Sequence, residues 1–145
     1  MPTPFEEVYK RFLDGKEDEV FALMSNETLE KKLFLYMEKT IALKFKQNKK
    51  KIKDYDEMLQ QFNVELDIEE INIIVLGMDL IYCEEQIERQ IRLQTKLGIS
   101  VSNRDYKITD NTPTLKELQE KKKQKENELK EAIISYSYND FAGYQ

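Results

Sequence analysis

Residues 67–97 read DIEEINIIVLGMDLIYCEEQIERQIRLQTKL, the longest helical pattern in the chain. Asp67 and Glu70 have the spacing of a capping box, which predicts a helix over 68–97. Apolar residues recur at helical spacing through its first half, so we expect that half to be buried and the charged second half to be exposed. Gly77 in its interior costs about 1 kcal/mol relative to alanine. We therefore expect another helix to approach the chain closely at this glycine.

The N-terminal part of the chain predicts two more helices. Thr3 is a capping residue three positions before Glu6, which predicts a first helix that ends at about Gly15. Either Ser25 or Asn26 is expected to cap a second helix that runs to about Asn48. This second helix is apolar on more than one face, so it is either central in the fold or shared with another chain.

A third capping box predicts a final helix over 114–135, whose middle carries no apolar residue and must be solvated or face a partner. Residues 98–113, before it, are expected to form the one long loop. Residues 61–66 are expected to form a short extended connector, with one strand-like pairing as an alternative but no sheet. We expect an all-α fold, with four to five helices in a small bundle, a long central helix and an extended C-terminal tail. The expected domains are a helical domain over 1–135 and an aromatic docking tail over 136–145.

The composition argues against catalysis. The 145 residues include no histidine, no tryptophan and one cysteine. The usual acid–base group at neutral pH is therefore missing, and one cysteine can form neither an intramolecular disulfide nor a thiolate zinc cage. The acidic clusters at 54–57 and 84–88 lack the spacing or the histidine partners of metal sites. We expect no enzyme, no catalytic residue, no metal and no cofactor. The most apolar stretch, 71–83, is too short to span a bilayer, so no membrane partner is expected.

Charge is segregated along the chain. The net charge is −5 over residues 1–30, +8 over 31–53, −10 over 54–90 and +2 over 91–145. One interpretation is a set of solvated helix faces. The other is a pair of complementary patches on neighbouring copies, because unlike surfaces suit the head-to-tail contacts that close into rings.

The strongest basic segment is 44–53, which holds six lysines. Such a segment favours contact with DNA or with an acidic partner. The alternative is a solvated helix end, where cations also suit the helix dipole. The candidate contact residues are Lys46, Lys49, Lys50, Lys51 and Lys53.

The last ten residues, 136–145, hold three tyrosines and one phenylalanine. Solvated tails are normally poor in aromatic residues, whereas tyrosine is common at interfaces. We expect partner docking by this segment, and intramolecular docking is the alternative. The candidate docking residues are Tyr136, Tyr138, Phe141 and Tyr144.

Several short motifs occur in a characteristic order along the chain. They are Thr3–Glu6, Lys44–Lys46, Gln61–Leu66 followed by Glu69–Ile71, Leu115–Leu118 and Ser135–Tyr138. In these motifs the chain resembles head–tail connector (adaptor or head-completion) proteins of tailed phages and prophages of low-GC Gram-positive bacteria. Those proteins tend to carry Trp-Leu-x-Pro-Gln late in the central helix, where this chain has Tyr82–Gln86.

The resemblance implies a structural protein of the virion neck that is assembled in the cytoplasm of the bacterial host. It implies a homo-oligomeric ring, with twelve copies as the expected number, that joins the portal protein to a neck or tail-completion protein. The aromatic residues of 136–145 would then dock on the portal, and the lysines of 44–53 would face packaged DNA or an acidic neighbour. The alternative function is a small helical regulator or chaperone-like factor that binds one partner through 114–135 and has no catalytic activity.

Overall fold

In the part of the chain that the structure describes, helices are joined by one small two-stranded hairpin, which confirms the predicted all-α class. The structure is a computed structural model that describes residues 2–14, 16, 19–46, 48–100 and 113–142, without the side chains of 19–20 and 139–142. Its elements are α1 (Phe5–Leu13), α2 (Glu19–Ala22), α3 (Asn26–Lys39), a π-helical turn η1 (Thr40–Lys44), β1 (Tyr55–Asp56), β2 (Gln61–Phe62), α4 (Ile68–Lys96) and α5 (Leu115–Ala142).

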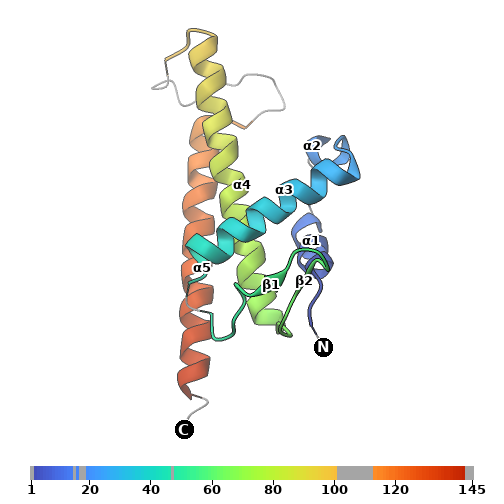
Figure 1. Cartoon of the computed structure of the whole chain (residues 1–145). Coiled ribbons are helices and arrows are strands. Elements are labelled where there is room, and N and C mark those ends of the chain that lie inside the picture. Colours follow the sequence, from blue (N-terminus) through green and yellow to red (C-terminus); the bar gives the residue numbers. More distant parts are fainter. Residues whose placement is uncertain (1, 15, 17–18, 47, 101–112, 143–145) are drawn as a thin grey trace.

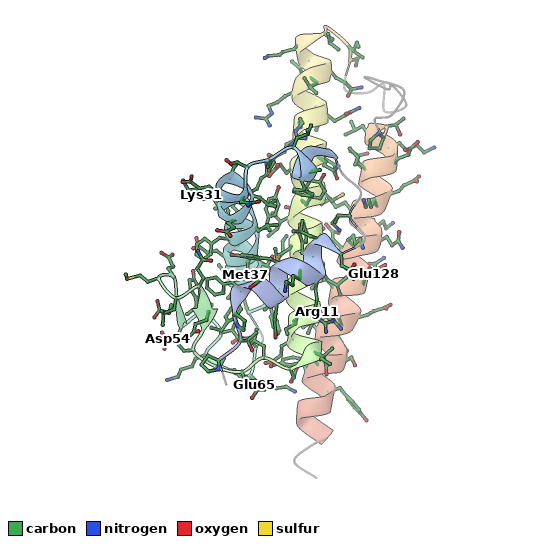
Figure 2. The ribbon with its side chains drawn as sticks, turned by 90° about the vertical axis from the view of Figure 1, so that its right-hand side faces the viewer. Arg11, Lys31, Met37, Asp54, Glu65 and Glu128 are labelled. Atoms are coloured by element: carbon green, nitrogen blue, oxygen red, sulfur yellow. The ribbon has the colours of Figure 1, made fainter. Side chains whose placement is uncertain are left out.

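The long helix α4 is the axis of the fold (Figure 1). The other long helix, α5, lies beside it, α3 crosses it obliquely, and α1 packs on the side of α4 away from α5. Strands β1 and β2 pair antiparallel, with Tyr55 opposite Phe62, near the start of α4. Figure 2 shows Lys31 of α3 and Asp54 before β1 on one side of α4, and Glu128 of α5 on the other.

The start of α4 confirms the predicted capping box. The backbone N–H of Glu70 donates to Asp67 Oδ1 at 2.8 Å, and that of Asp67 donates to Glu70 Oε1 at 3.0 Å. The first half of the helix is buried as expected. The expectation that the second half is exposed is wrong at Gln90 and Gln94, which are 3% and 0% exposed. An apolar pattern reports only apolar residues, so it does not register glutamines that pack inside.

The predicted close approach at Gly77 is confirmed, and the neighbour is Thr40 of η1. A Cβ added at Gly77 would overlap Thr40 Cγ2 and would lie 3.1 Å from its Oγ1. Thr40 is fully buried, and its hydroxyl donates to the Tyr36 carbonyl at 2.8 Å. The absence of a side chain at this position therefore allows η1 to pass directly over α4.

The predicted cap of α1 is wrong, although the helix lies where expected. Its N-cap residue is Pro4, and Thr3 is instead buried against the connector that leads into α4. The backbone N–H of Leu66 donates to Thr3 Oγ1 at 2.8 Å, and that of Phe62 donates to the Thr3 carbonyl at 2.8 Å. The Thr3 hydroxyl is engaged by a distant part of the chain, so it does not cap its own helix.

Two predicted helix ends are also corrected. The second helix ends with η1 at Lys44 rather than at Asn48, because the chain turns away at Phe45. Helix α5 continues to Ala142 rather than stopping at Ser135, so most of the predicted extended tail is helical. Residues 101–112 of the predicted loop and 143–145 of the predicted tail lie outside the described residues.

Candidate functional site

The two groups of residues singled out in the sequence, the lysines of 44–53 and the aromatic C-terminal segment, meet in the structure. The lysine segment is anchored by two fully buried side chains, Phe45 and Ile52. The Phe45 ring packs edge-on against Tyr136 near the end of α5, with 5.4 Å between the ring centroids. The lysine segment therefore lies against the C-terminal part of α5.

Tyr136 joins α5 to this segment through its hydroxyl. The hydroxyl donates to Glu70 Oε2 at 2.7 Å and accepts from the backbone N–H of Lys49 at 2.9 Å. Lys49 Nζ lies 4.1 Å from the centre of the Tyr136 ring, a cation–π distance. Burial, together with the hydrogen bond to Glu70 and its charge, raises the pKa of Tyr136 despite the opposing bond from Lys49. In this structure Tyr136 docks on its own chain, so for this residue the intramolecular alternative holds and the expected partner docking does not.

Glu70 is the centre of this junction. It is fully buried in the first turn of α4, where the helix dipole favours a carboxylate. Lys50 Nζ donates to Glu70 Oε1 at 2.7 Å and to the Glu65 carbonyl at 2.7 Å. One carboxylate therefore connects α4, the lysine segment and Tyr136 of α5 (together called the Glu70 junction). The capping box placed Glu70 at a helix start, but no local pattern predicted its distant partners.

The candidate lysines consequently divide into two groups. Lys50 is an internal partner of Glu70, and Lys49 contacts Tyr136. The remaining three are exposed, and no ion pair to another described residue is found for them. We call these three the lysine surface: Lys46, Lys51 and Lys53.

The candidate docking residues divide as well. Tyr138 is 69% exposed, so its side chain is available to a partner. The side chain of Phe141 and the whole of Tyr144 lie outside the described residues.

The acidic clusters have structural partners. Glu84 pairs with Lys44 of η1 at 3.2 Å, and Glu85 pairs with Lys32 of α3 at 2.7 Å, so the two carboxylates join α4 to both elements. In the hairpin turn, Asp56 Oδ1 accepts two backbone N–H groups, those of Met58 and Leu59. Among the described residues, no three His, Cys, Asp or Glu side chains are arranged to hold a metal ion. No described helix combines the length and apolar character needed to cross a membrane.

Glu85 gives a pH-dependent contribution to stability. Burial alone would raise its pKa, but hydrogen bonds from Lys32 and Tyr36 and the charges of Lys32 and Arg89 lower it overall. A carboxylate with a lowered folded-state pKa stabilises the fold above its unfolded pKa of about 4.3, and the contribution is lost as pH falls through the folded-state value. We expect Glu85→Gln to lower the free energy of unfolding by about 1 kcal/mol at neutral pH and by much less in acid.

Denaturant melts at neutral and acidic pH measure this difference. Glu88→Gln is the matched control, because Glu88 is exposed one turn further along α4. A Glu85→Gln deficit that is equally large in acid would contradict the assignment.

Cys83 is a packed thiol. It is 1% exposed, lies 3.3 Å from the Leu118 carbonyl of α5, and burial raises its pKa. Since the thiolate is the reactive form, we expect a water-soluble disulfide reagent to label the folded protein about 100-fold more slowly than the denatured one. Absorbance of the released thiol measures both rates, and equal rates would show that the thiol is accessible.

Comparison with known proteins identifies no relative of this chain. The chain matches no protein-family model, and neither a curated protein nor a solved structure is significantly similar to it.

Proposed function

We propose that this protein is a structural assembly protein, and specifically a head–tail connector that forms a ring between the portal and a neck or tail-completion protein of a phage virion. The observation that carries the proposal is the arrangement of charge on the surface. The lysine surface belongs to the segment that contacts α5 through Phe45 and Lys49, whereas three exposed carboxylates, those of Glu27, Glu30 and Glu57, lie at the start of α3 and in the hairpin turn. Unlike surfaces on one subunit support head-to-tail contact between identical copies, the contact that builds rings.

The end of α5 supports a docking role for the segment after the Glu70 junction. Tyr136 fixes the helix on the body of the protein, and Tyr138 comes two residues later with an exposed ring. The proposal therefore assigns portal contact to Tyr138, Phe141 and Tyr144, with Tyr136 as the anchor. The lysine surface is assigned to packaged DNA or to an acidic neighbour.

Co-expression with a phage portal protein tests this assignment. A chain truncated after Tyr138 and a Tyr138→Ser variant both keep Tyr136, so they are expected to fold while losing portal binding in a pull-down. Truncation after Ser135 is a poor test, because it also removes the Tyr136 anchor. Undiminished portal binding by the truncated Tyr138→Ser double variant would contradict the docking assignment.

A second function, a small helical regulator or chaperone-like factor, is favoured by one feature of α5. A groove of about 400 Å³ has an apolar lining of Leu80, Leu129, Ile133 and the 58% exposed Ile134, and charged side chains of Lys44, Glu126 and Lys130 also line it. Apolar surface on a helix suits a single partner helix. This function predicts a stoichiometric complex that Ile134→Ser disrupts and that needs no contact between identical copies.

A further inference from the structure

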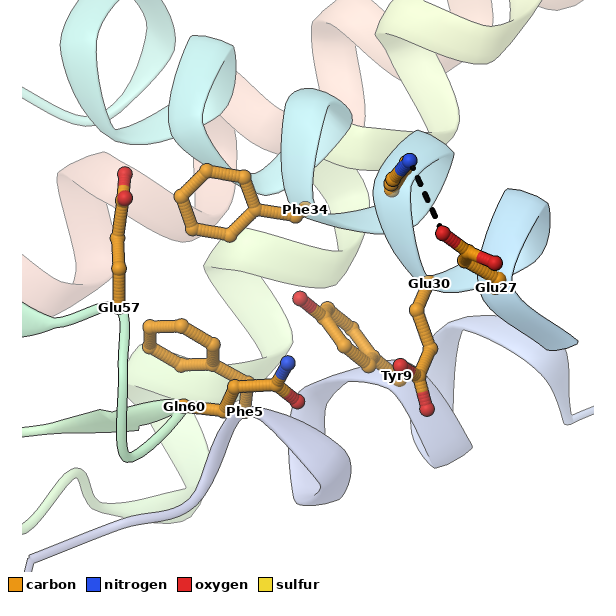
Figure 3. A pocket seen from close by; sticks show the side chains of 8 residues that line it. Phe5, Tyr9, Glu27, Glu30, Phe34, Glu57 and Gln60 are labelled. Carbon is orange, nitrogen blue, oxygen red and sulfur yellow. Dashed lines mark ion pairs between the residues drawn. The ribbon is translucent and has the colours of Figure 1, made fainter.

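A pocket of about 290 Å³ opens between α1, the start of α3 and the hairpin turn (Figure 3). Its inner walls are aromatic: Phe5 and Phe34, with ring centroids 5.7 Å apart, and Tyr9. Its rim is mainly acidic, with Glu57 on one side and Glu27 and Glu30 on the other. The pocket therefore combines π faces with carboxylates at its mouth.

Tyr9 gives the pocket an unused polar group. Its side chain is only 8% exposed, and within the described part of the chain its hydroxyl has no hydrogen-bond partner. Figure 3 shows that hydroxyl directed into the pocket, toward the space between Phe34 and Phe5. Burial, and then the charge of Glu30, raises the pKa of Tyr9, so the group stays a neutral phenol that can accept a hydrogen bond. The Tyr9 hydroxyl can therefore accept a hydrogen bond from a group that enters the pocket.

These features select a cation with an aliphatic stem. Aromatic faces attract ammonium groups and pack against methylene chains, and the rim carboxylates supply the counter-charge. The one basic residue at the rim, Lys31, is exposed and pairs with Glu27 at 3.3 Å. The other two carboxylates, those of Glu30 and Glu57, have no ion pair among the described residues. A lysine side chain from another molecule would supply an ammonium group for the carboxylates and the aromatic faces, a methylene chain to pack on the rings, and a hydrogen-bond donor for the Tyr9 hydroxyl.

We infer that this pocket receives a lysine from the lysine surface of a second copy of the chain. The charge distribution supports this occupant, because the pocket carries excess negative charge, whereas Lys46 and Lys51 are exposed on the segment that contacts α5 through Phe45 and Lys49. Donor and acceptor surfaces on one chain give a head-to-tail contact that can repeat from copy to copy. The inference rests on the assembly part of the proposed function and identifies the contact that would build the ring.

Complementary variants test the contact. The pocket variant is Glu30→Gln/Glu57→Gln, and the surface variant is Lys46→Gln/Lys51→Gln/Lys53→Gln. All five positions are exposed, so both variants are expected to fold, which circular dichroism checks. Neutral replacements avoid creating a new attraction between the two altered surfaces. Sedimentation velocity at low ionic strength and high concentration is the measurement.

We expect wild type to form oligomers that raised salt dissociates. Each variant alone is expected to associate about tenfold or more weakly than wild type. Their mixture is expected to form a one-to-one dimer and nothing larger, because it contains one intact pocket facing one intact lysine surface. Tyr9→Phe, which keeps the ring, is expected to weaken the wild-type contact.

Three results would overturn the inference: a wild type that stays monomeric, a pocket variant that associates as well as wild type, or a mixture that stays monomeric. The proposed function is judged separately, by the presence of the chain in virions. Virion incorporation of the pocket variant at wild-type levels would reject this contact and leave the connector function intact. The expected dimer of the mixture, with no chain in virions, would reject the connector function alone.

Discussion

Glu70→Ala is expected to lower the free energy of unfolding by about 3 kcal/mol. The substitution removes a buried carboxylate that accepts hydrogen bonds from Lys50, Tyr136 and the Asp67 backbone. It leaves Lys50 without its partner and opens a cavity under the end of α5. The side chain of Lys50 is 37% exposed, so its charge regains some water and the loss stays at the lower end of the range for buried pairs. Chemical denaturation followed by circular dichroism measures the change.

The control for this prediction is Glu131→Ala, an exposed position on α5 where a change within about 0.5 kcal/mol is expected. Tyr136→Phe should cost about 1 to 2 kcal/mol, because it leaves Glu70 and the Lys49 N–H each without one partner. The two losses should be far from additive, since both remove the same hydrogen bond. Additive losses, or a loss at Glu70 no larger than at Glu131, would show that the Glu70 junction does not hold the fold together.

Gly77→Ala is expected to destabilise the protein by about 2 kcal/mol, although alanine is the better helix former. The new methyl group would overlap Thr40 Cγ2, which cannot move aside easily. Thr40 is fully buried, β-branched and fixed by its hydrogen bond to the Tyr36 carbonyl. The crossing of η1 over α4 must therefore shift. Thermal denaturation measures the loss.

A second substitution tests the physical cause. Thr40→Ser removes Cγ2 and keeps the hydroxyl, so Gly77→Ala/Thr40→Ser should recover most of the loss. Gly98→Ala provides the comparison, because Gly98 has open space around it and a φ of 73°. Its cost of about 1 kcal/mol comes from backbone strain, and Thr40→Ser should not relieve it. A failure of Thr40→Ser to rescue Gly77→Ala would rule out the overlap as the cause.

The features predicted from the sequence are those whose signals are local. The capping box of α4, the burial of its first half and the close approach at Gly77 can each be read within a few turns of one helix. The features missed depend on contacts between distant residues. Thr3 was expected to cap α1, but its hydroxyl is engaged by Leu66, 63 positions away.

In the candidate site, too, the local features were predicted and the contacts between distant residues were not. The lysine segment and the aromatic segment stand out by composition, but their meeting at Glu70 joins residues up to 87 positions apart. The end of α5 was missed for this reason, because the bond from Tyr136 to Glu70 holds a helix where the composition resembles a tail. The pocket that Tyr9 lines could not be predicted from the sequence either, because its walls come from α1 and α3 and part of its rim comes from the hairpin turn.

Electron microscopy of particles purified from a culture that expresses this protein with its genomic neighbours tests the proposed function most directly. We expect a symmetric ring of this chain between the portal and the tail, with the lysine surface of each copy against the pocket lined by Phe5, Tyr9 and Phe34 of the next copy, and Tyr138 at the portal. Particles that assemble a complete neck without this chain, while the protein remains in a one-to-one complex with a single partner, would contradict it.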